Sequence, residues 1–291
     1  MPIHRFVLHN NRIRESGEGF LCAGQVGLLA GWGVFSTIRV SEGVLFAFER
    51  HWARMLRDAA RMHVPMPFEA AEVRRRLSEL VEANRAPHCT LRVAVIRNGG
   101  GPWEGAPKEL GSDLVALTAD TKSWGAGVRL TVQADARHSN CEFSGAKILS
   151  WAMNLTWLEN AQNQGFDEVI LLNERGEVTE CTSANVFIVQ DCEVFTPPLS
   201  SGCLPGITRE LLLSEVHAPG FQVSERTLKP NDFEKADEVF ITSTTRDLLP
   251  VLSINGRPMK NVGHVRPVLQ AAFCRYTDEY IGAHKDMNVP V

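Results

Sequence analysis

A lysine and a glutamate are the residues of this 291-residue chain best suited to chemistry. Lys147 follows a serine- and glycine-containing turn over 143–146 and opens an apolar run, so water solvates its charged form poorly. Such surroundings favour a neutral amine, which can condense with a carbonyl group to form a Schiff base. A lysine at a helix end can equally extend its ammonium to the surface, and the position alone leaves both interpretations open.

Glu180 follows in the chain, on a short strand after a turn over 173–176. A carboxylate beside a pyridine nitrogen keeps that nitrogen protonated, and the ring can then withdraw electrons from a substrate carbanion. Asn185 could orient this carboxylate, or it could simply begin the next strand. A glutamate on an exposed strand face is the alternative interpretation of Glu180.

The segment 204–209 has the composition of a phosphate-binding helix start. Its residues Gly206 and Ile207 lie where backbone N–H groups have no intrahelical partner and the helix dipole is positive. Thr208 adds a hydroxyl group. A helix that begins at a glycine and is capped by its own threonine has the same pattern, so a structural role fits as well.

Two further features could bind an anion. Four consecutive hydroxyl residues, among them Ser243 and Thr244, follow a strand predicted over 238–241 and form either anion ligands or an ordinary polar turn. Arg54, on a helix predicted over 49–62, carries a planar guanidinium that suits a phosphate better than an ammonium does. A solvated arginine among other arginines is the alternative for this residue.

The elements that must position these residues are short strands with helices at intervals. Apolar residues at i, i+3 and i+4 spacing predict helices over 49–62, 68–84, 148–164, 207–216 and 265–280. In the helix 148–164, the residues expected on the buried face are Ile148, Ala152, Leu155, Leu158 and Ala161. Strands are predicted over 3–9, 34–40, 90–97, 113–118, 128–134, 168–172, 177–181, 185–190, 193–196, 221–226, 238–242 and 251–254. This irregular order indicates an α+β fold rather than a regular βαβ series.

A polar segment over 119–127 divides the chain into two parts. We expect a small N-terminal α/β domain over residues 1–120 and a larger C-terminal domain over residues 121–291, which carries Lys147. The length of the chain agrees with two domains.

The composition excludes several classes of function. The chain is 44% hydrophobic and 22% charged with a net charge of −4, and no basic patch indicates nucleic-acid binding. No apolar run reaches the roughly 20 residues that cross a membrane, and the start lacks a signal-peptide core. The seven cysteines are scattered without CxxC spacing, which predicts neither a disulfide framework nor a metal site but reduced thiols in a cytoplasmic protein. Neither glycine-rich nucleotide-binding motif is present.

In combination and in order, these residues resemble the class IV aminotransferases, which are pyridoxal-phosphate enzymes of fold type IV. The family includes branched-chain aminotransferases, D-amino-acid aminotransferases and aminodeoxychorismate lyases. The matching segments are 35–40, 51–56, Lys147, 165–168, 176–187, 196–199, 204–209, Thr244 and 249–251, which cover almost the whole chain.

The resemblance implies a role for each matching residue. Lys147 corresponds to the lysine that binds pyridoxal 5'-phosphate as a Schiff base and moves the proton, and Glu180 to the partner of the pyridine nitrogen. The implied cofactor-binding set is Lys147, Arg54, Glu180, Asn185, Gly206, Ile207, Thr208, Ser243 and Thr244. The implied fold has a small α/β domain, a larger β-barrel-like domain with helices and the cofactor between them, in a homodimer.

The reaction implied first is transfer of an amino group from an amino acid or amine to a 2-oxo acid. Lys147 would abstract the proton next to the substrate nitrogen while the ring, kept protonated by Glu180, takes up electrons. The alternative is 4-amino-4-deoxychorismate lyase, which releases pyruvate and 4-aminobenzoate with the same cofactor. A non-catalytic binding protein on the same fold would have lost Lys147 or Glu180, and both are present.

The substrate end of the pattern departs from the branched-chain enzymes. Their tyrosine-glycine before the phenylalanine is missing, Ser36 replaces their glutamate, and the strand 91–96 lacks their arginine-proline motif. The runs 35–40 and 97–101 resemble the lyases more closely, as do the residues on either side of Glu180.

Aromatic and arginine side chains are the candidates for substrate contacts. We expect Phe35, Trp32 and Trp103 to line the substrate pocket, although a buried tryptophan is often only part of a core. Arg92 and Arg97 are the candidates for binding a substrate carboxylate. They lie on opposite faces of one strand, so we expect at most one of them to face the site.

Overall fold

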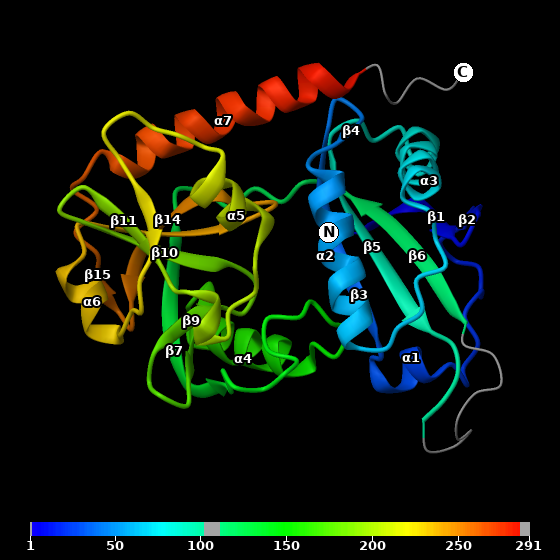
Figure 1. Cartoon of the computed structure of the whole chain (residues 1–291), viewed down its shortest axis with the longest axis horizontal. Helices are drawn as coiled ribbons and strands as arrows, with labels where there is room; N and C mark the ends of the chain where they lie inside the picture. The colour runs from blue at the N-terminus through cyan, green and yellow to red at the C-terminus, as the bar shows by residue number, and fades with distance from the viewer. Residues whose placement is uncertain (1, 102–110, 286–291) are drawn as a thin grey trace. The chain divides into compact units, whose positions relative to one another are not determined.

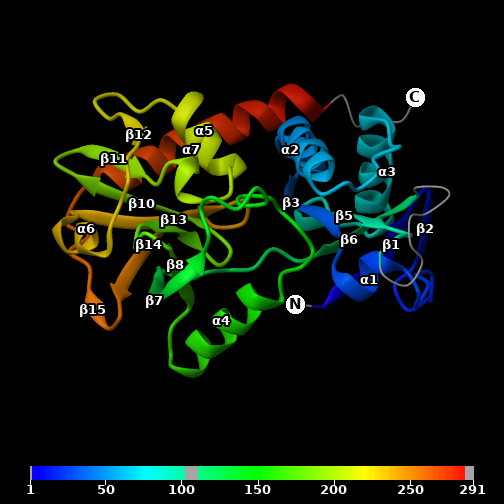
Figure 2. The same cartoon turned by 60° about the horizontal axis from the view of Figure 1, so that its bottom comes forward.

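The structure is a computed structural model that describes residues 2–101 and 111–285. The chain forms two compact units. The first comprises Met1–Lys122, Lys147–Trp151 and Thr277–Val291, and the second comprises Ser123–Ala146 and Ala152–Tyr276. Figure 1 and Figure 2 show the elements of each unit from two directions.

The first unit is built on a sheet that has, among the described residues, six strands in the order β2-β1-β6-β5-β3-β4. Neighbouring strands pair antiparallel. The strands are β1 (Ile3–His9), β2 (Arg12–Glu15), β3 (Gly33–Ser41), β4 (Val44–Leu45), β5 (Cys89–Arg97) and β6 (Ser112–Ala119). The helices are α1 (Val26–Ala30), α2 (Phe48–Arg61) and α3 (Ala70–Ala83), with the last residues of α7 (Val265–His284) from Thr277 onward.

Alternation along the central strands gives this sheet one apolar face, because successive side chains of a strand point to opposite sides. Val34 and Ile38 of β3 are at most 1% exposed and pack with Met55 of α2 and Leu77 of α3 in one core cluster. Figure 2 shows α2 and α3 on the same side of this sheet. The packing fixes the orientation of α2, the helix that carries Arg54.

The segment Lys147–Trp151 lies beside the start of β3 and is not helical, although the sequence predicted a helix from residue 148. Ile148 forms an antiparallel bridge with Val34, and the Leu149 N–H donates to the Gly33 carbonyl oxygen at 2.9 Å. Gly33 permits this approach, because a Cβ at that position would lie 2.6 Å from Leu149 Cδ1. Pairing with this end of β3 therefore competes with helix formation and places Lys147 in the first unit, whereas the sequence analysis placed it in the C-terminal part.

Helix α4 (Ala152–Asn163) begins after this segment and buries a narrower face than predicted. Leu155 was expected on the buried face but is 52% exposed. Ala161 packs instead with Val169 and Leu171 of the next strand, so only the last turn of the predicted apolar stripe reaches the sheet.

The second unit is built on a curled half-barrel sheet that has, in the described part, the strand order β12-β11-β10-β13-β14-β7-β8-β9, with β15 paired to β14. The strand β7 pairs in parallel with β14 and with β8, whereas β13 pairs antiparallel with β10 and with β14. The strands are β7 (Val128–Arg137), β8 (Glu168–Asn173), β9 (Val178–Cys181), β10 (Asn185–Gln190), β11 (Glu193–Thr196), β12 (Val223–Glu225), β13 (Glu238–Ser243), β14 (Asp247–Ile254) and β15 (Arg257–Pro258). Its other helices are η1 (Leu199–Ser201), α5 (Ile207–Ser214) and α6 (Pro230–Lys235).

The core of the second unit lies on the sheet formed by β10 and β13. Val186 and Ile188 of β10 pack with Ile241 of β13 and with Phe233 of α6 in one buried cluster. Figure 2 shows α4 and α5 on opposite sides of this sheet. The start of α5 and the ends of β9 and β13 carry the polar residues that the sequence analysis singled out.

Most predicted elements are present with ends that differ by a few residues, as is usual where helices fray and strands twist. The elements that the sequence analysis missed are α1, α6, η1, β2, β4 and β15, which are too short to show a periodic pattern. None of the helices within the described residues is long and apolar enough to cross a membrane. Trp103, a candidate for the substrate pocket, lies outside the described residues.

Candidate functional site

The backbone of Lys147 is fixed on both sides. Its carbonyl oxygen accepts from the Phe35 N–H at 3.1 Å, and its N–H donates to Asp58 Oδ2 at 3.0 Å. Asp58 is 1% exposed and also pairs with Arg57. A strand on one side and a helix on the other therefore determine where the Lys147 side chain starts.

The Lys147 side chain lies over an aromatic pair. Its Nζ is 4.6 Å from the ring centroid of Phe35 and 5.8 Å from that of Trp151, and the two rings meet edge to face at 5.9 Å. Arg92 lies over the same Phe35 ring at 3.9 Å, and burial lowers the pKa of its guanidinium. The arrangement brings an amine and a guanidinium to one pair of aromatic rings, which attract both cations.

Ser36, His51 and Arg54 form a buried polar cluster on the other face of β3. Arg54 Nη2 donates to Ser36 Oγ at 2.9 Å, so the Ser36 hydroxyl is left to donate to His51 Nδ1 at 2.7 Å. Burial and the charges of Arg54 and Lys147 lower the pKa of His51 well below its usual value, so the ring is neutral. Its proton is then assigned to Nε2, which is buried and has no hydrogen-bond partner among the described residues.

Arg97 and Trp32, two further candidates for substrate contacts, are engaged with each other. The Arg97 guanidinium lies 4.0 Å from the Trp32 ring centroid and donates to the carbonyl oxygens of Gly99 and His63. The Trp32 indole donates to the Met62 carbonyl oxygen at 2.7 Å. Of the two candidate arginines, Arg92 is therefore the one that lies with Phe35 near Lys147.

Glu180 of the second unit is 9% exposed and receives hydrogen bonds on both carboxylate oxygens. Leu204 N–H donates to Oε2 at 3.1 Å, and the Arg137 guanidinium donates to Oε1 at 3.4 Å. Arg137 also donates to Asn154 Oδ1, and the Asn154 amide donates to the Thr182 carbonyl oxygen. A cation and a backbone N–H thus hold Glu180 as an oriented carboxylate.

Sequence reasoning missed Arg137 and Asn154. Arg137 ends β7, where it pairs with Asn173 of β8, and Asn154 lies in the first turn of α4. Arg137 meets Glu180 through the register of β7 and β8, and Asn154 meets Arg137 through the packing of α4, so no pattern in either segment reveals these contacts. Both segments contain other polar side chains, so neither residue stands out in the sequence.

The predicted helix start at Gly206 is closely packed against Asn185. Asn185 Nδ2 donates to the Leu204 carbonyl oxygen at 2.9 Å, and a Cβ at Gly206 would lie 2.1 Å from Asn185 Oδ1. Ile207 and Thr208 follow as the first residues of α5, and both are 4% exposed. Only glycine fits here, and the first N–H groups of a helix are the ones that can bind an anion.

The second predicted cradle, which includes Ser243 and Thr244, is held by a buried ion pair. Arg246 Nη1 donates to Ser243 Oγ, and Arg246 Nη2 pairs with Glu168 at 3.2 Å. Both charged side chains are at most 7% exposed. Thr242 is 1% exposed, and its hydroxyl has no hydrogen-bond partner in the described part of the chain.

This ion pair carries a prediction about stability. We expect Glu168→Gln to lower the free energy of unfolding by about 3 kcal/mol, because Arg246 would stay buried without its counter-charge. For a chain of this size the Tm falls by roughly 6–12 °C. Thermal unfolding of the variant checks the value. Glu234→Gln is the control, since Glu234 pairs with Arg257 at the surface and its loss changes stability by at most about 1 kcal/mol. Equal stability of wild type and Glu168→Gln would contradict the account.

A family model described as amino-transferase class IV matches residues 33–254. The chain is 31% identical over 256 residues to a D-alanine aminotransferase of Bacillus licheniformis, which covers 86% of this chain and 89% of the relative. It is 30% identical over 253 residues to a putative branched-chain-amino-acid aminotransferase of Methanocaldococcus jannaschii, covering 85% of this chain and 88% of the relative.

Solved structures agree on the fold. The Escherichia coli branched-chain amino acid aminotransferase matches with a TM-score of 0.87 at 23% identity, covering 94% of this chain and 95% of that chain. The branched-chain amino acid aminotransferase of T.th., solved with pyridoxamine 5'-phosphate, matches with a TM-score of 0.86 at 24% identity over 96% and 97% of the two chains. The predicted fold class, α+β with a small domain and a larger barrel-like one, is confirmed.

Proposed function

Because the chain belongs to the class IV amino-transferase family, we propose that it transfers an amino group from an amino acid or amine to a 2-oxo acid with pyridoxal 5'-phosphate as cofactor. The observation that carries the proposal is the placement of Lys147, whose amine lies over Phe35 and Trp151 with Arg92 on the same ring. The residue types and their surroundings suit a Schiff-base lysine beside a carboxylate-binding arginine.

The residues of each unit fit a different part of the cofactor. In the first unit, the Nε2–H of buried His51 has no hydrogen-bond partner among the residues that the structure describes. It lies in the cluster with Arg54, which suits an acceptor such as a phosphate oxygen. In the second unit, the start of α5 at Gly206 offers backbone N–H groups, and the buried Thr242 hydroxyl offers a further donor. Glu180 offers an oriented carboxylate for a protonated ring nitrogen.

When bound, the cofactor supplies an aldehyde that condenses with amines and a ring that withdraws electrons from the carbon beside the substrate nitrogen. Lys147 Nζ would hold the cofactor through its aldehyde carbon. When an amino substrate takes that place, the Lys147 amine would be free to accept the proton from the substrate α-carbon and to deliver it to the cofactor carbon, as transfer of the amino group requires. Phe35 and Trp151 lie beside this amine, and Asp58 fixes its backbone.

Arg92 binds the substrate carboxylate in this proposal. We expect Arg92→Met to raise KM for α-amino acids about 10- to 100-fold, because a charge-assisted hydrogen bond is lost. The KM for an amine donor that lacks a carboxylate should not change. Steady-state kinetics with both donor types measure the difference. Arg12→Met, at an exposed position of β2, is the matched control. A rise in KM that is equal for both donors would exclude Arg92 as the carboxylate ligand.

Aminodeoxychorismate lyase activity is the second candidate. The observation that favours it is Ser36, which replaces the glutamate of the branched-chain pattern. Its hydroxyl is hydrogen-bonded to His51 and Arg54. Lys147 and Glu180 would serve both reactions, since proton abstraction is common to both. A non-catalytic binding protein is disfavoured because both residues are kept.

A substrate panel separates these candidates. L- and D-amino acids with 2-oxoglutarate or pyruvate test the transferase, and aminodeoxychorismate tests the lyase. Bleaching of the cofactor band to the pyridoxamine form, with release of a 2-oxo acid, marks a transferase. Release of pyruvate and 4-aminobenzoate without bleaching marks a lyase. If no substrate gives either result, the proposed function is contradicted.

The assembly and the location of the protein are further proposals. We propose a homodimer, as the family resemblance implies, and sedimentation at micromolar concentration tests it against a monomer. The seven cysteines all lie in the described part of the chain and are free thiols, which is in keeping with a reducing compartment such as the cytoplasm. Amino and 2-oxo acids are the proposed small-molecule partners.

A further inference from the structure

Asn173, at the end of β8, is a buried residue that the mechanism above does not use. It is 0% exposed, and its side-chain amide is saturated with hydrogen bonds. Its Nδ2 donates to the Ser201 carbonyl oxygen at 3.1 Å and to Glu177 Oε2 at 3.0 Å. Its Oδ1 accepts from the backbone N–H groups of Arg175 at 2.9 Å and Glu177 at 3.0 Å. Asn173 therefore joins the β8–β9 turn to the loop that contains Ser201.

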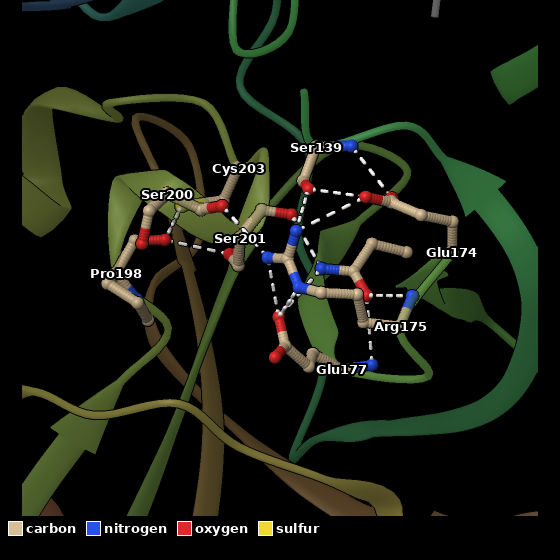
Figure 3. A network of polar contacts seen from close by, with 9 residues as sticks. Ser139, Glu174, Arg175, Glu177, Pro198, Ser200, Ser201 and Cys203 are labelled. Atoms are coloured by element: carbon tan, nitrogen blue, oxygen red, sulfur yellow. Dashed lines mark hydrogen bonds and ion pairs between the residues drawn. The ribbon is translucent and has the colours of Figure 1, made fainter. Parts of the chain in front are cut away.

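This turn is itself held by a polar network around Arg175 (Figure 3). Arg175 pairs with Glu177 at 2.7 Å and donates to the Ser200 carbonyl oxygen at 3.1 Å. It also donates to Ser139 Oγ, while Ser139 donates to Glu174 through its backbone N–H and its hydroxyl. These bonds to Ser139 lower the pKa of Glu174 to about 2, so the network stays charged at neutral pH.

Hydrogen bonds and close packing constrain the loop 198–204 between its contacts with Asn173 and Glu180. The Ser201 N–H and hydroxyl both donate to the Pro198 carbonyl oxygen. Gly202 has a left-handed φ of 97°, and a Cβ there would lie 2.7 Å from Ser144 Oγ, so the loop lies close against that residue. Cys203 is 2% exposed. Because these contacts constrain the loop, we expect a displacement of Ser201 to shift Leu204 as well.

At the end of this loop, the Leu204 peptide is bound on both sides. Its N–H donates to Glu180 Oε2 at 3.1 Å, and its carbonyl oxygen accepts from Asn185 at 2.9 Å. The register of β7 and β8 also pairs Asn173 with Arg137, the other partner of Glu180. Both hydrogen-bond partners of the Glu180 carboxylate thus depend on the end of β8.

We propose that Asn173 is a positioning residue for Glu180, because its amide holds the loop 198–204 so that the Leu204 N–H is directed at the Glu180 carboxylate. The inference rests on the proposed function insofar as Glu180 binds the ring nitrogen of the cofactor. Its structural part, the link from Asn173 to the Leu204 N–H, holds without the cofactor and can be tested without it.

The test uses Asn173→Asp, which keeps the shape of the side chain but replaces the donating amide with a carboxylate facing Glu177. In the cofactor-free protein, we expect the exchange rate of the Leu204 amide hydrogen to rise at least about tenfold, because its acceptor is no longer aligned. Single-residue hydrogen exchange measures this. We expect the affinity for pyridoxal 5'-phosphate to fall about tenfold and the visible circular dichroism of each bound cofactor to decrease.

The matched control is Asn261→Asp. Asn261 also bonds to backbone groups of the second unit, at Val239 N–H and the Val251 carbonyl oxygen, but has no contact with the loop 198–204. The Asn261→Asp variant should leave the exchange rate of the Leu204 amide hydrogen and the dichroism of the bound cofactor unchanged. If Asn173→Asp does not fold, Arg175→Ala replaces it. Arg175 is exposed, and its removal breaks the hydrogen bond to the Ser200 carbonyl oxygen, so the Leu204 exchange rate should rise by a smaller factor.

An unchanged Leu204 exchange rate in Asn173→Asp, or in its substitute Arg175→Ala, would overturn the proposal. A rise that is equal at Leu204 and at Ile241, in the core strand β13, would also overturn it, because the effect would then be a general loss of stability. A selective rise at Leu204 supports the positioning role. Wild-type protein that protects Leu204 but does not bind pyridoxal 5'-phosphate would refute the proposed function and leave the structural link intact.

Discussion

Replacing Lys147 with alanine should abolish turnover, with a loss of at least about 10³-fold in kcat. The reason is that one amine both binds the cofactor aldehyde and moves the α-proton, and the structure places no second lysine beside Phe35 and Trp151 within the described residues. The visible absorbance of the purified protein should shift as well, because the cofactor would no longer be bound as a Schiff base. Stopped-flow absorbance and steady-state turnover measure both effects.

Lys147→Arg separates the charge of this residue from its chemistry. A guanidinium keeps the positive charge over the Phe35 ring but does not act as a nucleophile at neutral pH. We therefore expect it to be as inactive as Lys147→Ala and to fold as the wild type does. Activity within tenfold of the wild type in either variant would show that another group carries the reaction.

The second large effect is expected at Glu180. Glu180→Gln keeps the size of the side chain and the hydrogen bond from the Leu204 N–H, but it removes the negative charge. The cofactor ring would lose the partner that keeps its nitrogen protonated, so we expect kcat to fall on the order of 10²-fold. The folded state should survive, although Arg137 loses the counter-charge that it has at 3.4 Å.

The control for Glu180→Gln is Glu193→Gln, at an exposed position of β11. It removes the same charge from the same unit and should leave kcat unchanged. Single-turnover rates with one amino acid donor compare the two variants, since these rates report proton abstraction rather than product release. Equal rates for Glu180→Gln and wild type would contradict the role of Glu180 as the partner of the ring nitrogen.

Sequence reasoning proposed site residues where their neighbours in the chain form a pattern. Lys147, Gly206 and Thr208 lie in short local patterns, and a helix or strand next to each pattern places it. The order of these segments along the chain then indicated the family, whereas Lys147 alone could not indicate it. The α+β class followed from the same local signals, because short strands and amphipathic helices differ in period.

Residues that act through register or tertiary contact were not predictable. Arg137 meets Glu180 only because β7 and β8 pair in parallel, and no local pattern specifies that register. The first four residues of the helix predicted over 148–164 are not helical for a similar reason, since pairing with Val34 outweighs helix propensity at Ile148. Arg92 and Arg97 could not be distinguished until Arg97 was seen to donate to two carbonyl oxygens.

The central claim is that Lys147 carries the cofactor, and borohydride reduction of the purified wild-type protein tests it most directly. Incubation with pyridoxal 5'-phosphate should give a visible Schiff-base band, and reduction should remove the band and fix the cofactor covalently. Peptide mass spectrometry should then find the pyridoxyl group on the peptide that contains Lys147. Fixation on a different lysine, or no visible band after incubation, would contradict the account.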